Sequence, residues 1–145
     1  MNDKIVSVYS ITELCKGDNF SFEELIDSDM VNNFALLVGD YSPLHMDNRF
    51  AKSRRFNGRV IHGVLLLGLL SRLIGMHLPG ENALIISMNS QFIVPAYIGD
   101  KVRVYAEVDQ ISLDIKVIVL NAKIERSPDF SRALVRSKIM VKFTN

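Results

Sequence analysis

The apolar positions of the chain change their spacing near residue 82. Before that point they recur mostly every three or four residues, as in helices, and after it they mostly alternate with polar ones, as in half-buried strands. An early exception, residues 19–26, predicts a strand. Asp27 or Ser28 then predicts the N-cap of a helix that ends at Gly39, a residue suited to a left-handed C-terminal cap. The apolar face of this helix is predicted to comprise Val31, Phe34, Ala35 and Val38.

The middle of the chain predicts loops followed by one long apolar helix. Pro43 cannot continue the preceding helix, so residues 40–46 are predicted to be a loop. A short helix over 48–53 and a second loop over 54–60 follow. The segment 64–76 is apolar on nearly all sides, which predicts a helix that is buried all round.

The C-terminal half of the chain predicts strands that form an antiparallel meander, because its apolar residues alternate with polar ones. With the long helix packed on this sheet, the predicted class is an α+β domain. The four predicted strands are 83–94, 101–108, 116–124 and 134–143, with the loop 127–131 between the last two.

Length and composition indicate the overall class of the protein. A chain of 145 residues can build a core of its own, so we expect a single domain over 1–145. Its 48% hydrophobic and 23% charged residues are typical of globular proteins rather than disordered ones. A net charge of +1 gives no electrostatic signature for binding nucleic acid or an anionic membrane.

Cellular location is predicted from the N-terminus, the apolar helix and the cysteine content. The first residues lack the basic start and apolar stretch of a signal peptide, and 64–76 is shorter than the ~20 residues that span a bilayer. Cys15 is the single cysteine and cannot close an intrachain disulfide, so we expect it to be a small core residue in a reducing compartment. A cytoplasmic protein without membrane contact is predicted.

Asp40 and His45 are the first candidates for chemistry. They flank four residues that include Pro43, and a tight loop of this kind can hold a carboxylate and an imidazole around one water. From the spacing alone, an Asp that caps the next turn and an exposed loop His is the simpler interpretation.

Gly63 is the second candidate, because it follows His62 at the start of the long helix. Unpaired N–H groups at that end can stabilise an oxyanion, although a glycine there can also simply relieve crowding. Ser71 lies a little over two turns further along, on roughly the same face.

The basic residues Lys52, Arg54, Arg55 and Arg59 could contact phosphates of a nucleotide-like ligand, or simply form a solvated loop. The three histidines and the cysteine show no metal-ligand spacing, so no metal site is predicted.

Taken together, residues 34–47 resemble the motif of MaoC-like dehydratases, the (R)-specific enoyl-CoA hydratases. The run Phe-Ala-Leu-Leu-Val-Gly-Asp-Tyr-Ser-Pro-Leu-His-Met-Asp is similar to that family's Phe-Ala-x-x-(Ser/Thr)-Gly-Asp-x-Asn-Pro-(Leu/Ile)-His-x-Asp. The resemblance continues through residues 60–63, 71–75 and 78–80 and resumes at 98–100, so it covers about 17–110.

The resemblance implies a hot-dog fold, a long helix wrapped by an antiparallel sheet, paired as a homodimer. It implies hydration of a trans-2-enoyl thioester of coenzyme A or acyl-carrier protein to the (R)-3-hydroxyacyl thioester, and the reverse dehydration, without a metal or redox cofactor. Asp40 and His45 match the catalytic dyad and Gly63 the backbone donor to the thioester oxygen. Ser71, Ser42 and His62 would support them, and Arg54, Arg55 and Arg59 are the candidate contacts for coenzyme A phosphates.

The chain departs from the motif at a few positions. Ser42 stands for the Asn, Val38 for the small hydroxyl residue, and Gly58-Arg59 for the usual Arg-Pro. These changes leave open a non-catalytic subunit that binds acyl thioesters. A hot-dog thioesterase is the other alternative, but residues 64–80 contain no acid to activate water for hydrolysis.

Overall fold

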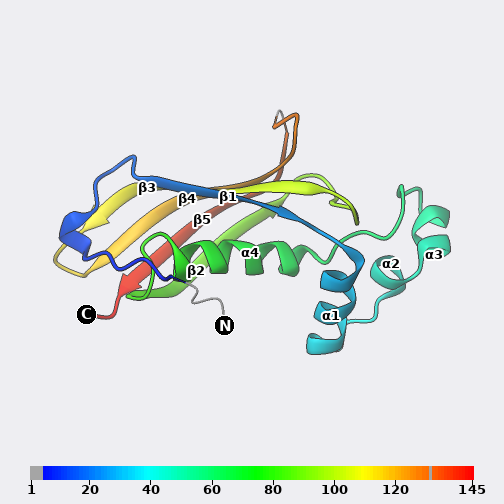
Figure 1. Cartoon of the computed structure of the whole chain (residues 1–145), viewed down its shortest axis with the longest axis horizontal. Coiled ribbons are helices and arrows are strands. Elements are labelled where there is room, and N and C mark those ends of the chain that lie inside the picture. The colour runs from blue at the N-terminus through cyan, green and yellow to red at the C-terminus, as the bar shows by residue number, and fades with distance from the viewer. Residues whose placement is uncertain (1–4, 131) are drawn as a thin grey trace.

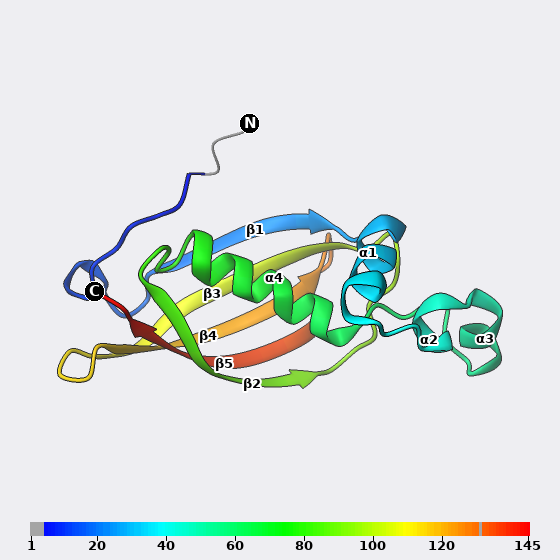
Figure 2. The same cartoon turned by 90° about the horizontal axis from the view of Figure 1, so that it is seen from below.

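The computed structural model describes residues 5–130 and 132–145. Five antiparallel strands form one curved sheet, and a long helix lies along one face of it (Figures 1 and 2). This is the predicted α+β architecture. The elements in chain order are a 3-10 helix Ile11–Glu13, β1 Asn19–Leu25, α1 Ser28–Val38, α2 Pro43–Met46, α3 Asn48–Ser53, α4 Gly63–Met76, β2 Ala83–Phe92, β3 Lys101–Ser112, β4 Val117–Arg126 and β5 Ala133–Phe143.

The start of α1 follows the sequence prediction. Asp27 is the N-cap, and its side chain accepts a hydrogen bond from the Met30 N–H at 2.9 Å. Gly39 ends the helix with φ of 77°, the left-handed conformation that glycine adopts most readily. The predicted apolar face is only partly correct, because Val38 is 53% exposed at the end of α1 that extends past the sheet.

The loop predicted over 40–46 contains one helical turn, α2. Pro43 is its first residue, a position where the missing N–H costs nothing and the fixed φ favours helix. Pro43 therefore starts a new helix as well as excluding continuation of α1. The short helix predicted over 48–53 is confirmed as α3, capped by the Asp47 carboxylate, which accepts from the N–H groups of Arg49 and Phe50.

The helix α4 is confirmed, but it is not buried all round. A single sheet layer covers only one of its faces, so Val64, Gly68, Ser71 and Gly75 lie exposed along the opposite side. The covered face consists of Leu65, Leu66, Leu69, Leu70, Leu73 and Ile74, all buried in the main core. Within the described residues, no helix is long and apolar enough to cross a membrane.

The predicted meander is correct for three strands only. Strands β3, β4 and β5 are consecutive neighbours, but β2 pairs with β5, and β1 pairs with the free edge of β3. An eight-residue link, 93–100, containing Pro95 carries the chain from β2 past the end of the sheet to β3 instead of a tight hairpin turn. The loop between β4 and β5 is where predicted, although residue 131 lies outside the described residues.

Cys15 is exposed, contrary to the prediction of a core position. Its N–H donates to the Asp18 carboxylate at 2.8 Å in a turn, and the preceding residue, Leu14, occupies the core instead.

Leu70 provides a test of this packing, because it is fully buried between α4 and the sheet. We expect Leu70→Ala to lower the free energy of unfolding by about 2–5 kcal/mol, since the truncation leaves a cavity. Urea denaturation at one fixed protein concentration measures the loss. Leu113→Ala, at a 57% exposed position in the turn after β3, is the matched control and should change it by less than about 1 kcal/mol. Equal losses in the two variants would contradict the packing described.

Candidate active site

The residues predicted to carry chemistry lie close together where α4 begins, beside the short helices that extend past the sheet. One ring nitrogen each of His45 and His62 and one carboxylate oxygen of Asp40 lie within 4.8 Å of one another. The two rings stack, with centroids 4.0 Å apart. Residues separated by up to 22 positions in the chain are thereby brought into one cluster.

The protonation of His45 follows from its partner. Its Nδ1 lies 2.7 Å from the main-chain oxygen of Val60, and a carbonyl oxygen can only accept, so Nδ1 carries the hydrogen. In the neutral ring, Nε2 is then unprotonated and can accept a proton from water. The Val60 carbonyl therefore fixes both the tautomer and the direction of the imidazole.

His62 is nearly fully buried and holds the loop that carries Asp40. Its Nε2 donates to the main-chain oxygen of Asp40 at 3.0 Å, while the carboxylate Oδ2 is 3.8 Å away. The shorter contact is the hydrogen bond, so the neutral ring leaves Nδ1 unprotonated, and that atom is buried without a partner among the described residues. His62 thus serves as a support that contacts the backbone of Asp40 and the ring of His45.

The Asp40 carboxylate is half exposed and is oriented by the backbone. The Ser42 N–H donates to its Oδ1 at 3.1 Å, whereas the Ser42 side chain makes no capping hydrogen bond to α2. The main-chain contact does not depend on the side chain at position 42. The replacement of the motif's Asn by Ser42 therefore leaves this contact available.

The N-terminus of α4 supplies an unpaired donor next to these side chains. His62 occupies the N-cap without capping through its side chain, and the Gly63 N–H has no acceptor among the described residues. A Cβ at Gly63 would lie 2.7 Å from a ring carbon of Phe92, so glycine allows this close packing. The unpaired N–H and the helix dipole together favour a negatively charged oxygen.

An apolar cavity of about 390 Å³ opens beside His45 and Gly63. Its walls come from the first turn of α4, the end of β2 and the link 93–100. Such a cavity suits an apolar ligand with a polar group at its Gly63 end. The apolar wall residues are Val60, Ile61, Val64, Leu66, Phe92, Ile93, Val94, Pro95 and Ala96.

The other predicted site residues lie outside the cluster of Asp40, His45 and His62. Ser71 is exposed on the open side of α4 and does not line the cavity. Arg54 and Arg55 are exposed, and the Arg54 guanidinium lies over the Phe50 ring. Arg59 is instead engaged within the protein, because its guanidinium donates to the main-chain oxygen of His45 at 2.6 Å and to Asn32 Oδ1 at 2.7 Å. Sequence spacing gave no sign of this role.

The cluster also has to be considered as a metal site, because its three side chains are close enough to share an ion. Two of the four ring nitrogens carry the hydrogens that they donate to carbonyl oxygens, and the free Nδ1 of His62 is buried. This leaves His45 Nε2 and the Asp40 carboxylate, fewer than the three protein ligands of a typical catalytic zinc site. The donor set favours proton transfer over metal binding.

Comparison with known proteins identifies a family and several relatives that this chain resembles. The profile of the MaoC like domain matches residues 14–127. An (R)-specific enoyl-CoA hydratase of Aeromonas caviae is 35% identical over 91 residues, 63% of this chain and 68% of that protein. A 3-hydroxybutyryl-CoA dehydratase of Methylorubrum extorquens is 38% identical over 101 residues, 70% of this chain and 60% of that protein.

Solved structures agree on the fold. The structure of the (R)-hydratase from A. caviae involved in PHA biosynthesis superposes with a TM-score of 0.84 at 29% identity, covering 90% of this chain and 97% of that one. The architecture described above is therefore the hot-dog fold.

Arg59 offers a test of how the site is held. We expect Arg59→Ala to speed amide hydrogen exchange in residues 42–47 by about tenfold, because one hydrogen bond to a charged group contributes roughly 1.5 kcal/mol. Mass spectrometry of the corresponding peptide measures this. Arg54→Ala removes an exposed arginine of the same region and should leave the exchange rate unchanged. Equal exchange in Arg59→Ala and the unmodified protein would rule out this support.

Proposed function

The chain belongs to the family of MaoC-like domains, and from this premise we propose that it adds water to trans-2-enoyl thioesters and catalyses the reverse dehydration. The product of hydration would be the (R)-3-hydroxyacyl thioester, carried on coenzyme A or acyl-carrier protein. The observation that carries the proposal is that His45 and the Gly63 N–H line one apolar cavity, with Asp40 next to His45.

Substrate binding follows from the cavity. The apolar walls would hold the acyl chain, and the thioester oxygen would accept from the Gly63 N–H. Attack of water on the double bond moves negative charge onto that oxygen as an enolate. A preorganised backbone donor stabilises such charge by about 3 kcal/mol.

Proton transfer is assigned to the dyad. A water between Asp40 and His45 would donate one hydrogen to the free Nε2 of His45 while its oxygen bonds to the β-carbon. The Asp40 carboxylate would accept a hydrogen bond from the second hydrogen, which stays on the oxygen, and would so orient the water. The proton returned to the α-carbon comes from the imidazolium, so the dyad ends in its starting state. Delivery from one side gives syn addition.

Hydrolysis of the thioester is the principal alternative. Thioesterases of this fold commonly use an Asp or Glu on or near the central helix to activate water, and α4 contains no acid. The cavity wall likewise includes no carboxylate among its described residues. A non-catalytic binding subunit would keep the cavity and lack the reaction. Assays with crotonyl-CoA separate the three functions: hydration lowers the absorbance of the conjugated thioester without releasing thiol, hydrolysis releases thiol, and binding alone does neither.

The dyad variants test the mechanism. We expect Asp40→Asn and His45→Gln each to lower kcat for crotonyl-CoA hydration by about 10²–10⁴-fold, since each removes a proton-transfer or water-orienting group. The double variant should lose little more than either single one, because the two residues act on one water. Circular dichroism should show an unchanged fold. Turnover near that of the unmodified enzyme in either single variant would contradict the assignment.

A homodimer is proposed from the distribution of exposed apolar side chains. β2 is an edge strand, and Leu84, Ile86 and Phe92 on it are 47–55% exposed. On the open side of α4, Val64 is 63% exposed. An apolar edge of this kind is a surface that a partner covers. Pairing of two β2 edges about a twofold axis would extend the sheet and place the α4 helices near each other.

We expect light scattering at micromolar concentration to give twice the mass of the chain. Ile86→Lys should shift the protein toward monomer, because it places a charge in the proposed contact. Leu113→Lys, in a turn at the far end of β3, is the control and should stay dimeric. A monomer mass for the unmodified protein would contradict the proposal.

A further inference from the structure

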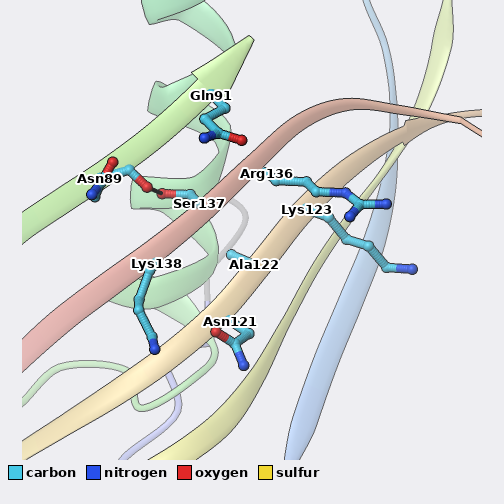
Figure 3. A pocket seen from close by; sticks show the side chains of 8 residues that line it. All are labelled: Asn89, Gln91, Asn121, Ala122, Lys123, Arg136, Ser137 and Lys138. Carbon is cyan, nitrogen blue, oxygen red and sulfur yellow. Dashed lines mark hydrogen bonds between the residues drawn. The ribbon is translucent and has the colours of Figure 1, made fainter. Parts of the chain in front are cut away.

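The sheet carries a second hollow, on the face that points away from α4 (Figure 3). It has a volume of about 520 Å³ and lies over β2, β5 and β4. We call it the outer groove. Successive residues of a strand face opposite sides, so exposed Arg136 and Lys138 of β5 point outward while buried Val135 and Ile139 point into the core. The residues lining it are Asn89, Gln91, Asn121, Ala122, Lys123, Arg136, Ser137 and Lys138.

Strand register places these polar side chains in two adjacent rows. Arg136 of β5 lies between Gln91 of β2 and Lys123 of β4, and Lys138 lies between Asn89 and Asn121. The groove therefore presents three cations and three amides. Among the described residues that line it, none is acidic.

The nearest acids pair with the two lysines of the groove and with cations outside it, and none of these pairs includes Arg136. Glu125 accepts from Lys123 and from Arg103, each at 2.7 Å. Burial works against ionisation of Glu125, but these hydrogen bonds outweigh it, so its pKa lies below the ordinary value. Asp109 lies 3.5 Å from Lys16 and 3.7 Å from Lys138.

Arg136 has no ion pair or hydrogen bond of its side chain to any described residue. It nevertheless stands directly opposite Lys123 and two residues from Lys138 on the same face. Like charges directly across a strand pair are destabilising. An anion between them would remove that repulsion, and an arginine fork is well shaped to bind phosphate.

The charge pattern also decides between possible occupants. A second copy of this chain, docked face to face about a twofold axis, would set these cations opposite the same cations. A multiply charged anion is complementary to all three, and the amides of Asn89, Gln91 and Asn121 can donate to its oxygens. A volume of about 520 Å³ lies within the range of small-molecule sites.

We propose that the outer groove binds a polyphosphate-bearing small molecule, with Arg136 as its principal contact. This site lies across the sheet from the acyl cavity and does not depend on the hydratase activity. Lys123 and Lys138 would add charge at the two sides of the Arg136 guanidinium.

Titration calorimetry with inorganic pyrophosphate as the probe tests the site. The full-length protein is expected to bind one pyrophosphate per chain, with affinity falling as salt is raised. Arg136→Gln should weaken binding at least tenfold. The affinity of Arg136→Lys should lie between those of Arg136→Gln and the unmodified protein. Lys142→Gln is the matched control, because Lys142 is exposed on the same face of β5 about 20 Å away. It should bind like the unmodified protein.

Hydration of crotonyl-CoA without pyrophosphate should be the same in Arg136→Gln, which shows that the variant is folded. Three results would overturn the proposal: no saturable binding, equal weakening in Arg136→Gln and Lys142→Gln, or a loss in Arg54→Gln in place of Arg136→Gln. The second would mean general charge attraction, and the third would move the anion to the loop near α3.

Discussion

The burial of one leucine face of α4 against the curved sheet determines where every other part of the site can lie. Leu66, Leu70 and Leu73 are almost completely buried, and a helix packed this way cannot slide without opening cavities. Its first turn is also fixed by the strand-like contact between the Ile61 N–H and the Ala96 carbonyl at 2.8 Å. The unpaired N–H of Gly63 is therefore held in one place relative to the cavity wall.

Asp40 and His45 are held in place relative to α4 by hydrogen bonds that main-chain carbonyl groups accept. Val60, two residues before the N-cap of α4, accepts from His45, and the buried His62 donates to the carbonyl of Asp40. Helix α1 joins the core through Val31, whereas α2 and α3 lie past the end of the sheet (Figure 2). Polar contacts add to the packing there, and Arg59 joins the loop to α1 through Asn32. Hydrogen bonds as well as buried apolar side chains therefore position this region.

Local chemistry explains what could be predicted from the sequence. Asp27, Gly39 and the alternation in the strands act through their immediate neighbours, so the elements they define agree with prediction. The closeness of Asp40 and His45 was also predictable, because four residues separate them. The stacking of His62 on His45 and the reach of Arg59 were not, since they depend on how distant segments pack. The same limit explains why Cys15 and one side of α4 are exposed although both were predicted to be buried. The hydrophobicity of a residue does not show how many layers of the structure cover it.

Because successive residues of a strand face opposite sides, the sheet has an apolar inner face and a polar outer face. Along β5, Val135, Ile139 and Val141 enter the core that seats α4, while the residues between them form the outer surface. Stability requires only that the inner positions stay apolar, and it sets no requirement for arginine or lysine on the outer ones. Glutamate opposite Arg136 would relieve the repulsion more simply than a bound ligand, as Glu125 does beside Lys123. Arg136, directly opposite Lys123 and without an acidic partner among the described residues, is therefore better explained by a ligand than by the fold.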